Sequence, residues 1–504
     1  MAAATGLAAL VVFRHLGTKP LWLDEAVSVS VAGRHLGGLL SVLPHQDANA
    51  GLYYLVLHGW LRLGHGAAFI RAPSAVAFVI TAGLAAWAGC RRGGIWLGTA
   101  LGLLVVTNRQ LVFYGQEARP YAISVLFAAA ATAALLADEE RPAARCYVAA
   151  TVAALYTNLF AGLFVGAQGL AVIVGFRRRG RAVPPVFWRC WIAAALAALP
   201  LAALMVGRER AQISWVPRPS FAALRGTVVD LGNGAVGLAV LVGLALLAVA
   251  EASSAVPREA GRRWPGADPR PGGGPRSGGD RPAAAGPGQR RAVAVLGAAF
   301  VVPPLVLWSV GQAVPTFVDR YIVSSALGII GLAALGVAAL RRWAGATAAA
   351  LALAVAAAPG AVAVLRLERA PFKYENPPAV VATITGGTQA GDAVGFGGGG
   401  LRTVIDLYRP PGSAFPTDIS LAAGPPGGGQ RVYAPETDAI TLRRRLAGVT
   451  RLWLVTDPSD HRYPSSGPLA TVRSTVLSGF RVGMAWSSPG IDVTLYVRSA
   501  PTRP

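Results

Sequence analysis

Long apolar stretches recur along the first three quarters of this chain, and they limit what it can fold into. Many are near 20 residues, which is about the length of helix needed to cross the roughly 30 Å hydrocarbon core of a bilayer. Of the 504 residues, 54% are hydrophobic and 14% are charged, whereas a soluble domain carries about 25% charged residues. The sequence therefore predicts a polytopic α-helical membrane protein.

About eleven transmembrane helices are expected from the apolar stretches. They cover roughly residues 2–16, 69–89, 95–107, 120–137, 147–157, 160–176, 189–206, 232–250, 292–311, 321–340 and 344–366. The first stretch lacks the polar cleavage region of a signal peptide, so we expect it to be a span.

Arginine clusters between these stretches indicate the orientation of the chain. They are Arg91-Arg92, Arg141 with Arg145, Arg177 to Arg181, the Arg-rich stretch 257–291, and Arg341-Arg342. With the N-terminus inside, all of them fall on the cytoplasmic side, as the positive-inside rule requires. These topology-determining arginines account for the net charge of +22, so no nucleic-acid partner is expected. The cysteines (Cys90, Cys146 and Cys190) also fall at cytoplasmic ends of spans, so no disulfide framework is expected.

The composition divides the chain into two domains. Residues 1–366 form the membrane domain, whose long outer loop, 17–68, contains two amphipathic segments at about 26–42 and 50–63. Residues 251–291 are rich in Pro, Gly and Arg and have almost no apolar content, so a disordered cytoplasmic loop is expected there.

Residues 367–504 are predicted to form a small extracytoplasmic α/β domain. Gly, Pro, Asp and Thr become more frequent, and short β-rich runs appear at 392–396, 451–456 and 493–497 with helical segments between them. The glycine run 397–400 superficially suggests a phosphate loop. It lacks the GK[ST] ending of that motif, so a flexible turn is favoured.

Two adjacent carboxylates, Asp24 and Glu25, follow the first apolar stretch on the outer side. One interpretation is a pair of solvated loop residues that cap the helix beginning near Ala26. The functional interpretation is that one carboxylate deprotonates an acceptor hydroxyl, while the other orients it or binds a metal.

The same outer loop carries a second polar group, made of His45, Asp47, Asn49, Tyr53 and Tyr54. Tyrosines at the bilayer edge are often interfacial anchors. Because this group shares a loop with the carboxylate pair, it is also a candidate substrate or acceptor region.

Two arginines lie just before outer ends of spans. Arg119 stands between Glu117 and Tyr121, and Arg320 precedes a later span. Snorkelling to the membrane surface is one explanation. The other is a phosphate site, because a cation at a helix N-terminus attracts that group. Glu117 and Tyr121 then join the candidate substrate region.

The order of these motifs resembles the GT-C glycosyltransferases. It is most similar to the bacterial branch related to protein O-mannosyltransferases and lipid A aminoarabinose transferase. The motifs are Asp24-Glu25, Leu52-Tyr53-Tyr54, Arg71 to Ser74, Glu117 to Tyr121, and Arg320-Tyr321. The resemblance covers about residues 17–345, and the C-terminal domain matches only loosely.

The resemblance implies a polyprenyl-phosphate sugar as donor and a catalytic carboxylate at Asp24, with Glu25 beside it. It places Arg119, Arg320 and Arg71 near the donor phosphate. The chain departs from the pattern at Asn49, where many relatives carry a histidine, and likewise at Asn158. A divalent metal, with Glu25 and Asp47 as possible ligands, and the identity of the acceptor are left open by these departures.

The expected activity is transfer of a sugar, mannose or another hexose or a pentose, to a hydroxyl of a glycan, lipid or protein. It would occur on the outer face of the cell membrane. Phosphate leaves as an anion, so a single base suffices, and one displacement inverts the anomeric carbon. One alternative is a transporter or flippase for a lipid-linked sugar, which should place ionisable groups near mid-membrane. Another is a catalytically silent membrane protein that binds cell-envelope glycan.

Overall fold

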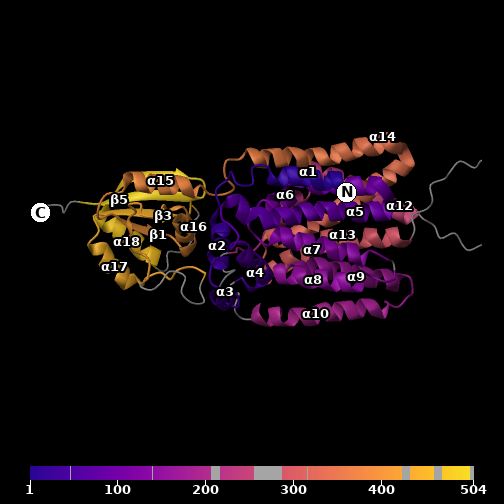
Figure 1. The fold of residues 1–504 in the computed structure, drawn as a ribbon, viewed down its shortest axis with the longest axis horizontal. Helices are drawn as coiled ribbons and strands as arrows, with labels where there is room; N and C mark the ends of the chain where they lie inside the picture. Colours follow the sequence, from indigo (N-terminus) through magenta and orange to yellow (C-terminus); the bar gives the residue numbers. More distant parts are fainter. Residues whose placement is uncertain are drawn as a thin grey trace, which may run out of the picture.

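A computed structural model describes residues 1–499 except 46, 139, 206–215, 255–286, 315, 423–431 and 459–467. The molecule is elongated, with a helical bundle at one end of its long axis and a small α/β domain at the other (Figure 1). Helices α2, α3 and α4 lie between the two. The expected disordered loop 251–291 falls mostly outside the described residues.

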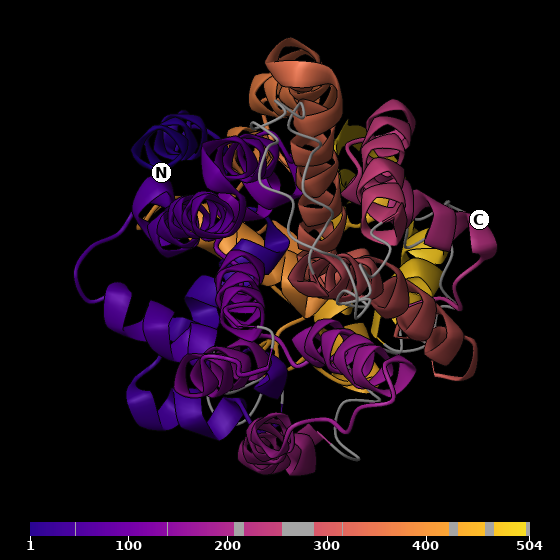
Figure 2. The same cartoon turned by 90° about the vertical axis from the view of Figure 1, so that its right-hand side faces the viewer.

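The helices of the bundle run roughly along the long axis and are seen end-on in Figure 2. They are α1 (Ala2–Phe13), α5 (Ala67–Val106), α6 (Arg109–Gly115), α7 (Tyr121–Leu135), α8 (Ala144–Thr157), α9 (Ala161–Arg178), α10 (Pro185–Met205), α11 (Phe221–Leu231), α12 (Ala235–Ser254), α13 (Pro287–Ala313), the 3-10 helix η3 (Asp319–Ser325) and α14 (Ala326–Arg369). Each expected apolar stretch falls on one of these helices. Within the described part of the chain, six helical segments are long and apolar enough to cross a membrane.

Glycines interrupt the two longest helices where the sequence predicts turns between consecutive spans. Gly94 in α5 has φ 75° and Gly345 in α14 has φ 89°, a left-handed conformation that glycine adopts without steric cost. Each break lets one long helix supply two antiparallel segments. Elsewhere glycine allows close packing: a Cβ at Gly336 of α14 would collide with the backbone carbonyl of Leu244 in α12. Small residues at such contacts are typical of membrane helix pairs.

The outer loop is largely helical. It contains α2 (Leu23–Ala32), α3 (Leu36–Val42), the short 3-10 helix η1 (Ala48–Ala50) and α4 (Gly51–Trp60). These helices bury their apolar faces against one another and against the start of α7, through Val31, Leu39, Tyr54 and Ala122. Because this packing fixes α2, it also fixes the carboxylate pair in its first turn.

The C-terminal domain is a five-stranded mixed sheet with the order β2-β1-β3-β5-β4. Its elements are α15 (Pro377–Gly387), β1 (Ala393–Phe396), α16 (Gly399–Tyr408), β2 (Thr417–Asp418), α17 (Ala439–Ala447), β3 (Arg451–Thr456), α18 (Pro468–Gly479), β4 (Phe480–Ser488) and β5 (Ile491–Arg498). The expected β-rich runs became β1, β3 and β5. The core surrounds Trp453, which is fully buried and donates a hydrogen bond to Asp392.

Candidate functional site

Asp24 lies in the first turn of α2 and faces two guanidinium groups. Its Oδ2 atom is 3.6 Å from Nη2 of Arg119 and 3.6 Å from Nη2 of Arg320. Arg119 lies just before α7, with Pro120 between them, and Arg320 lies in η3 just before α14. The starts of three helices therefore bring together residues that are nearly 300 positions apart in sequence.

Hydrogen bonding at this centre is incomplete. Within the described part of the chain, the buried atoms Asp24 Oδ2 and Arg119 Nε have no hydrogen-bond partner, and the 3.6 Å ion-pair distances are too long for hydrogen bonds. Arg119 donates a long bond of 3.4 Å to the Ser28 hydroxyl. A buried polar group without a partner costs about 1–3 kcal/mol. Unused hydrogen-bond donors and acceptors at a charged centre are suited to binding a polar ligand.

A small polar cavity adjoins Arg119. It is lined by Asp47, Asn49, Ala50, Arg119, Pro120, Tyr121, Thr157, Asn158 and Tyr321. On this wall the Tyr54 hydroxyl donates to Asp47 at 2.7 Å. The predicted residues Asp47, Asn49 and Tyr121 thus meet Arg119 around one cavity.

An apolar groove lies directly beside this polar cavity. It has a volume of about 770 Å³ and runs between the outer loop helices and the helices α8 and α10. Its lining includes Leu43, Leu52, Leu55, Val152 and Leu204. The two spaces share η1 and the end of α8, because Ala48 and Tyr156 of the groove adjoin Asn49 and Thr157 of the cavity. An amphiphile with an anionic head and a hydrocarbon tail matches this pair of spaces.

Glu25, the neighbour of Asp24, points away from the cavity into a fully buried ion pair with Arg71. Arg71 donates to Glu25 from Nε at 2.7 Å and from Nη2 at 2.6 Å. Its remaining N–H groups donate to the carbonyls of Leu16, Lys19 and Pro20. All five donors of Arg71 are therefore used within the protein, and its side chain is 1% exposed.

Glu117 and Lys373 extend this buried charge cluster. Lys373 Nζ is 3.8 Å from Glu25 and 3.8 Å from Glu117, and it donates to the Gln116 carbonyl at 2.5 Å. Burial raises the pKa of Glu117 to about 7, with Glu25 and Asp24 adding to the effect. Burial likewise lowers the pKa of Lys373 to about 8, although both carboxylates oppose this.

Lys373 did not emerge from the motifs, because it is a single lysine in the segment that joins α14 to the C-terminal domain. Its position in the sequence could have indicated it: Lys373-Tyr374-Glu375 contains the first charged residues after Arg369, where the last helix of the bundle ends. Tyr321, which lines the polar cavity, had a sequence signal in its place beside Arg320.

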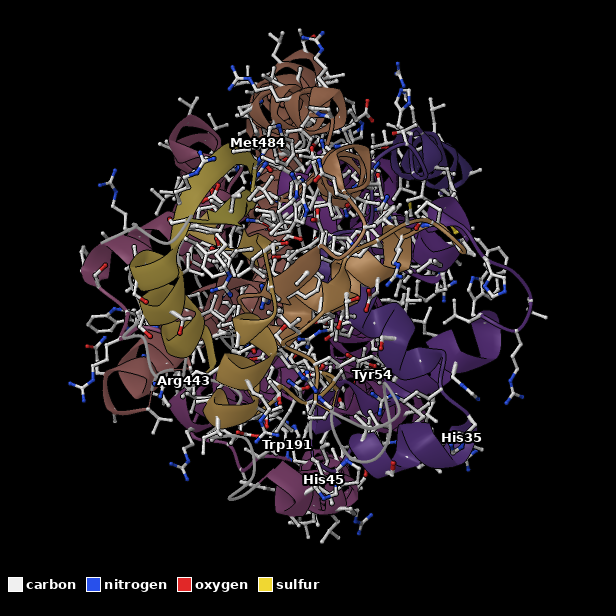
Figure 3. All side chains as sticks on the ribbon, turned by 90° about the vertical axis from the view of Figure 1, so that its left-hand side faces the viewer. His35, His45, Tyr54, Trp191, Arg443 and Met484 are labelled. Atoms are coloured by element: carbon white, nitrogen blue, oxygen red, sulfur yellow. The ribbon has the colours of Figure 1, made fainter. Side chains whose placement is uncertain are left out.

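The structure places the other predicted residues less centrally. Tyr53 is buried behind the site, with 1% exposure. His45 contacts the Ser41 carbonyl at 3.0 Å within its own loop, and in Figure 3 it lies nearer the rim of the molecule than Tyr54 does. Among the described residues, no cluster of three His, Cys, Asp or Glu side chains is arranged to hold a metal ion.

The fold and this arrangement of residues define a membrane protein with a charged centre at the end of its helical bundle that faces the α/β domain. Two solved structures have the same fold. They are ArnT from Cupriavidus metallidurans in the apo state, with a TM-score of 0.56, and the same protein bound to undecaprenyl phosphate, with a TM-score of 0.55. Each is 11% identical to this chain, and each alignment covers 98% of this chain and 97% of ArnT.

The match over nearly the whole of both chains confirms the GT-C-like fold that the motif order predicted, with the C-terminal domain included. No protein-family model and no curated protein matches the sequence.

Proposed function

We propose that this protein is a membrane glycosyltransferase that moves a sugar from a polyprenyl-phosphate donor to an acceptor hydroxyl on the outer face of the cell membrane. One observation carries the proposal: a carboxylate and two arginines meet beside an apolar groove, and among the described residues Asp24 Oδ2 and Arg119 Nε have no hydrogen-bond partner. The arginines suit the donor phosphate, the groove suits its hydrocarbon tail, and the carboxylate suits the base.

In the proposed reaction, Asp24 accepts the proton of the acceptor hydroxyl. The acceptor oxygen attacks the anomeric carbon of the sugar, and the bond from that carbon to the phosphate oxygen breaks. Polyprenyl phosphate leaves with the bonding electrons, and its new negative charge is stabilised by Arg119 and Arg320. The single displacement inverts the anomeric configuration, and no general acid is required.

The contacts of Glu25 and Arg71 favour a supporting role for both. Glu25 accepts from Arg71 and from the Ala118 amide at 2.9 Å, which joins α2 to the loop that carries Arg119. We therefore assign Arg71 to holding Glu25, not to the donor phosphate, and we favour the orienting role of Glu25 over metal binding. Asp47, the other possible metal ligand, accepts from Tyr54.

The ArnT structures support the donor class. One of them is bound to undecaprenyl phosphate, a polyprenyl phosphate of the kind that this reaction would release. The similarity in fold does not indicate which sugar is transferred. The proposed displacement is the same for a hexose and for a pentose.

The test is to incubate membranes containing the protein with a panel of radiolabelled polyprenyl-phosphate sugars and to follow the label. Transfer of one label to a glycan, lipid or protein fraction, lost in Asp24→Asn, supports the proposal. If the wild-type protein moves no label while binding undecaprenyl phosphate, the alternative of a lipid-linked sugar transporter gains support instead.

A further inference from the structure

The segment between α14 and α15 contacts the residues on both sides of Asp24. Glu375 accepts a hydrogen bond from the backbone amide of Leu23 at 2.8 Å. Lys373 lies 3.8 Å from the carboxylate of Glu25. The residue before the proposed base and the residue after it are therefore both held by one short run of chain from outside the membrane bundle.

Glu375 provides a hydrogen-bond acceptor for a backbone amide in the first turn of α2. The first N–H groups of a helix have no partner within it, and Leu23 is the first residue of α2. A carboxylate at that end also interacts favourably with the helix dipole. Glu375 thereby fixes the start of α2, one residue before Asp24.

Lys373 acts on the other side of Asp24. Its side chain is 1% exposed and lies between Glu25 and Glu117, where its charge reduces the repulsion between two buried carboxylates. It also donates to the Gln116 carbonyl, in the loop that leads to Arg119. The lysine therefore links α2 to the loop of the proposed phosphate ligand.

The C-terminal domain packs against the same segment and the same helix. Tyr408 of α16 accepts from the Leu21 amide at 2.5 Å, and Gly400 packs against the Leu23 side chain. A Cβ at Gly490, in the turn between β4 and β5, would press on Glu375. Tyr374 packs against Trp22 in a tilted arrangement, with ring centroids 4.4 Å apart.

We propose that Lys373 and Glu375 are positioning residues that set the start of α2, so that correct seating of the C-terminal domain is required for the rate of transfer. The effect on rate rests on the proposed function, whereas the effect on α2 does not. Neither residue is proposed to touch the sugar or the phosphate.

Amide hydrogen exchange of α2 tests the structural part without any assumption about the reaction. Glu375→Ala removes the acceptor of the Leu23 amide, so exchange at Leu23 should accelerate at least about tenfold, while Glu375→Gln keeps a carbonyl acceptor and should retain protection. Asp438→Ala is the matched control, because it removes an N-cap of α17 in the same domain, where Asp438 accepts from Ile440 and Thr441.

Transfer kinetics test the functional part with the same variants, using the radiolabelled polyprenyl-phosphate sugar that the wild-type protein accepts. Glu375→Ala should lower kcat by roughly 10- to 100-fold, because small misplacements of a reacting group are costly. KM for the donor should change less than threefold, and Glu375→Gln and Asp438→Ala should stay within threefold of wild type. Lys373→Met should resemble Glu375→Ala in kcat.

Unchanged exchange at Leu23 in Glu375→Ala would overturn the inference. Normal kcat in both Glu375→Ala and Lys373→Met, beside an inactive Asp24→Asn, would also overturn it and would leave the proposed function standing. If the wild-type protein transfers no sugar, the proposed function fails, and the exchange result alone decides whether this segment orders α2.

Discussion

Replacing Arg119 with alanine should weaken the binding of polyprenyl phosphate without unfolding the protein. Among the described residues Arg119 Nε has no hydrogen-bond partner, and the guanidinium makes long contacts of 3.4 Å to the Ser28 hydroxyl and 3.6 Å to Asp24. Little internal bonding is lost on truncation, so the main loss is the charge-assisted contact to phosphate. Such a contact is worth about 1.5–3 kcal/mol, which corresponds to a roughly 10- to 100-fold higher Kd.

The assay is titration of the purified protein with undecaprenyl phosphate, followed by transfer rates at subsaturating donor. Arg119→Lys should recover only part of the affinity, because an ammonium lacks the planar fork of a guanidinium. Arg62→Ala is the matched control: Arg62 also belongs to the loop 17–68 but is exposed and hydrogen-bonds to His58 of the same helix region. Wild-type affinity and rate in Arg119→Ala would remove this residue from the site and refute the reasoning.

Three further outcomes follow from the structure. Arg71→Lys should lower the melting temperature and the folded yield, because an ammonium has three donors and cannot replace the five that Arg71 gives to Glu25 and to three backbone carbonyls, and each buried acceptor left without a partner costs about 1–3 kcal/mol; a normal melting temperature would contradict this. Because burial raises the pKa of Glu117 from 4.5 to about 7, the folded protein retains a proton there that the unfolded chain has released. Wild-type stability should therefore fall by up to about 3 kcal/mol as pH rises from 4.5 to 7, and thermal melts of Glu117→Gln should lack this part of the decline. In a background without native cysteines, an impermeant thiol reagent should label Leu477→Cys in intact cells and Ile95→Cys only after permeabilisation, and the reverse pattern would invert the proposed topology.

The fold was accessible from sequence because apolar length determines most of it. Each expected stretch falls on a helix, and the breaks at Gly94 and Gly345 lie in or beside the short gaps expected between stretches, 90–94 and 341–343. Strand β4 was not predicted. Its pairing with β5 shifts register between Val482 and Met484, and its largely exposed side chains give it no clear apolar run.

The candidate site was only partly accessible. Asp24, Arg119 and Arg320 stood out because charges at outer ends of apolar stretches are costly without a role, and the structure brings them together. The partner of Glu25 could not be read from the sequence, since Arg71 lies 46 residues away. Lys373 reaches the same cluster only through the packing of the C-terminal domain, which no local pattern encodes.

The measurement that tests the central claim most directly is sugar transfer by Asp24→Asn together with its affinity for undecaprenyl phosphate. Asparagine keeps the shape of the side chain and removes its basicity. The proposed mechanism predicts a rate lower by about 10²- to 10⁴-fold, with donor binding preserved or tightened because the arginines lose a competing carboxylate. Transfer at the wild-type rate in Asp24→Asn would contradict the assignment of the base and the mechanism built on it.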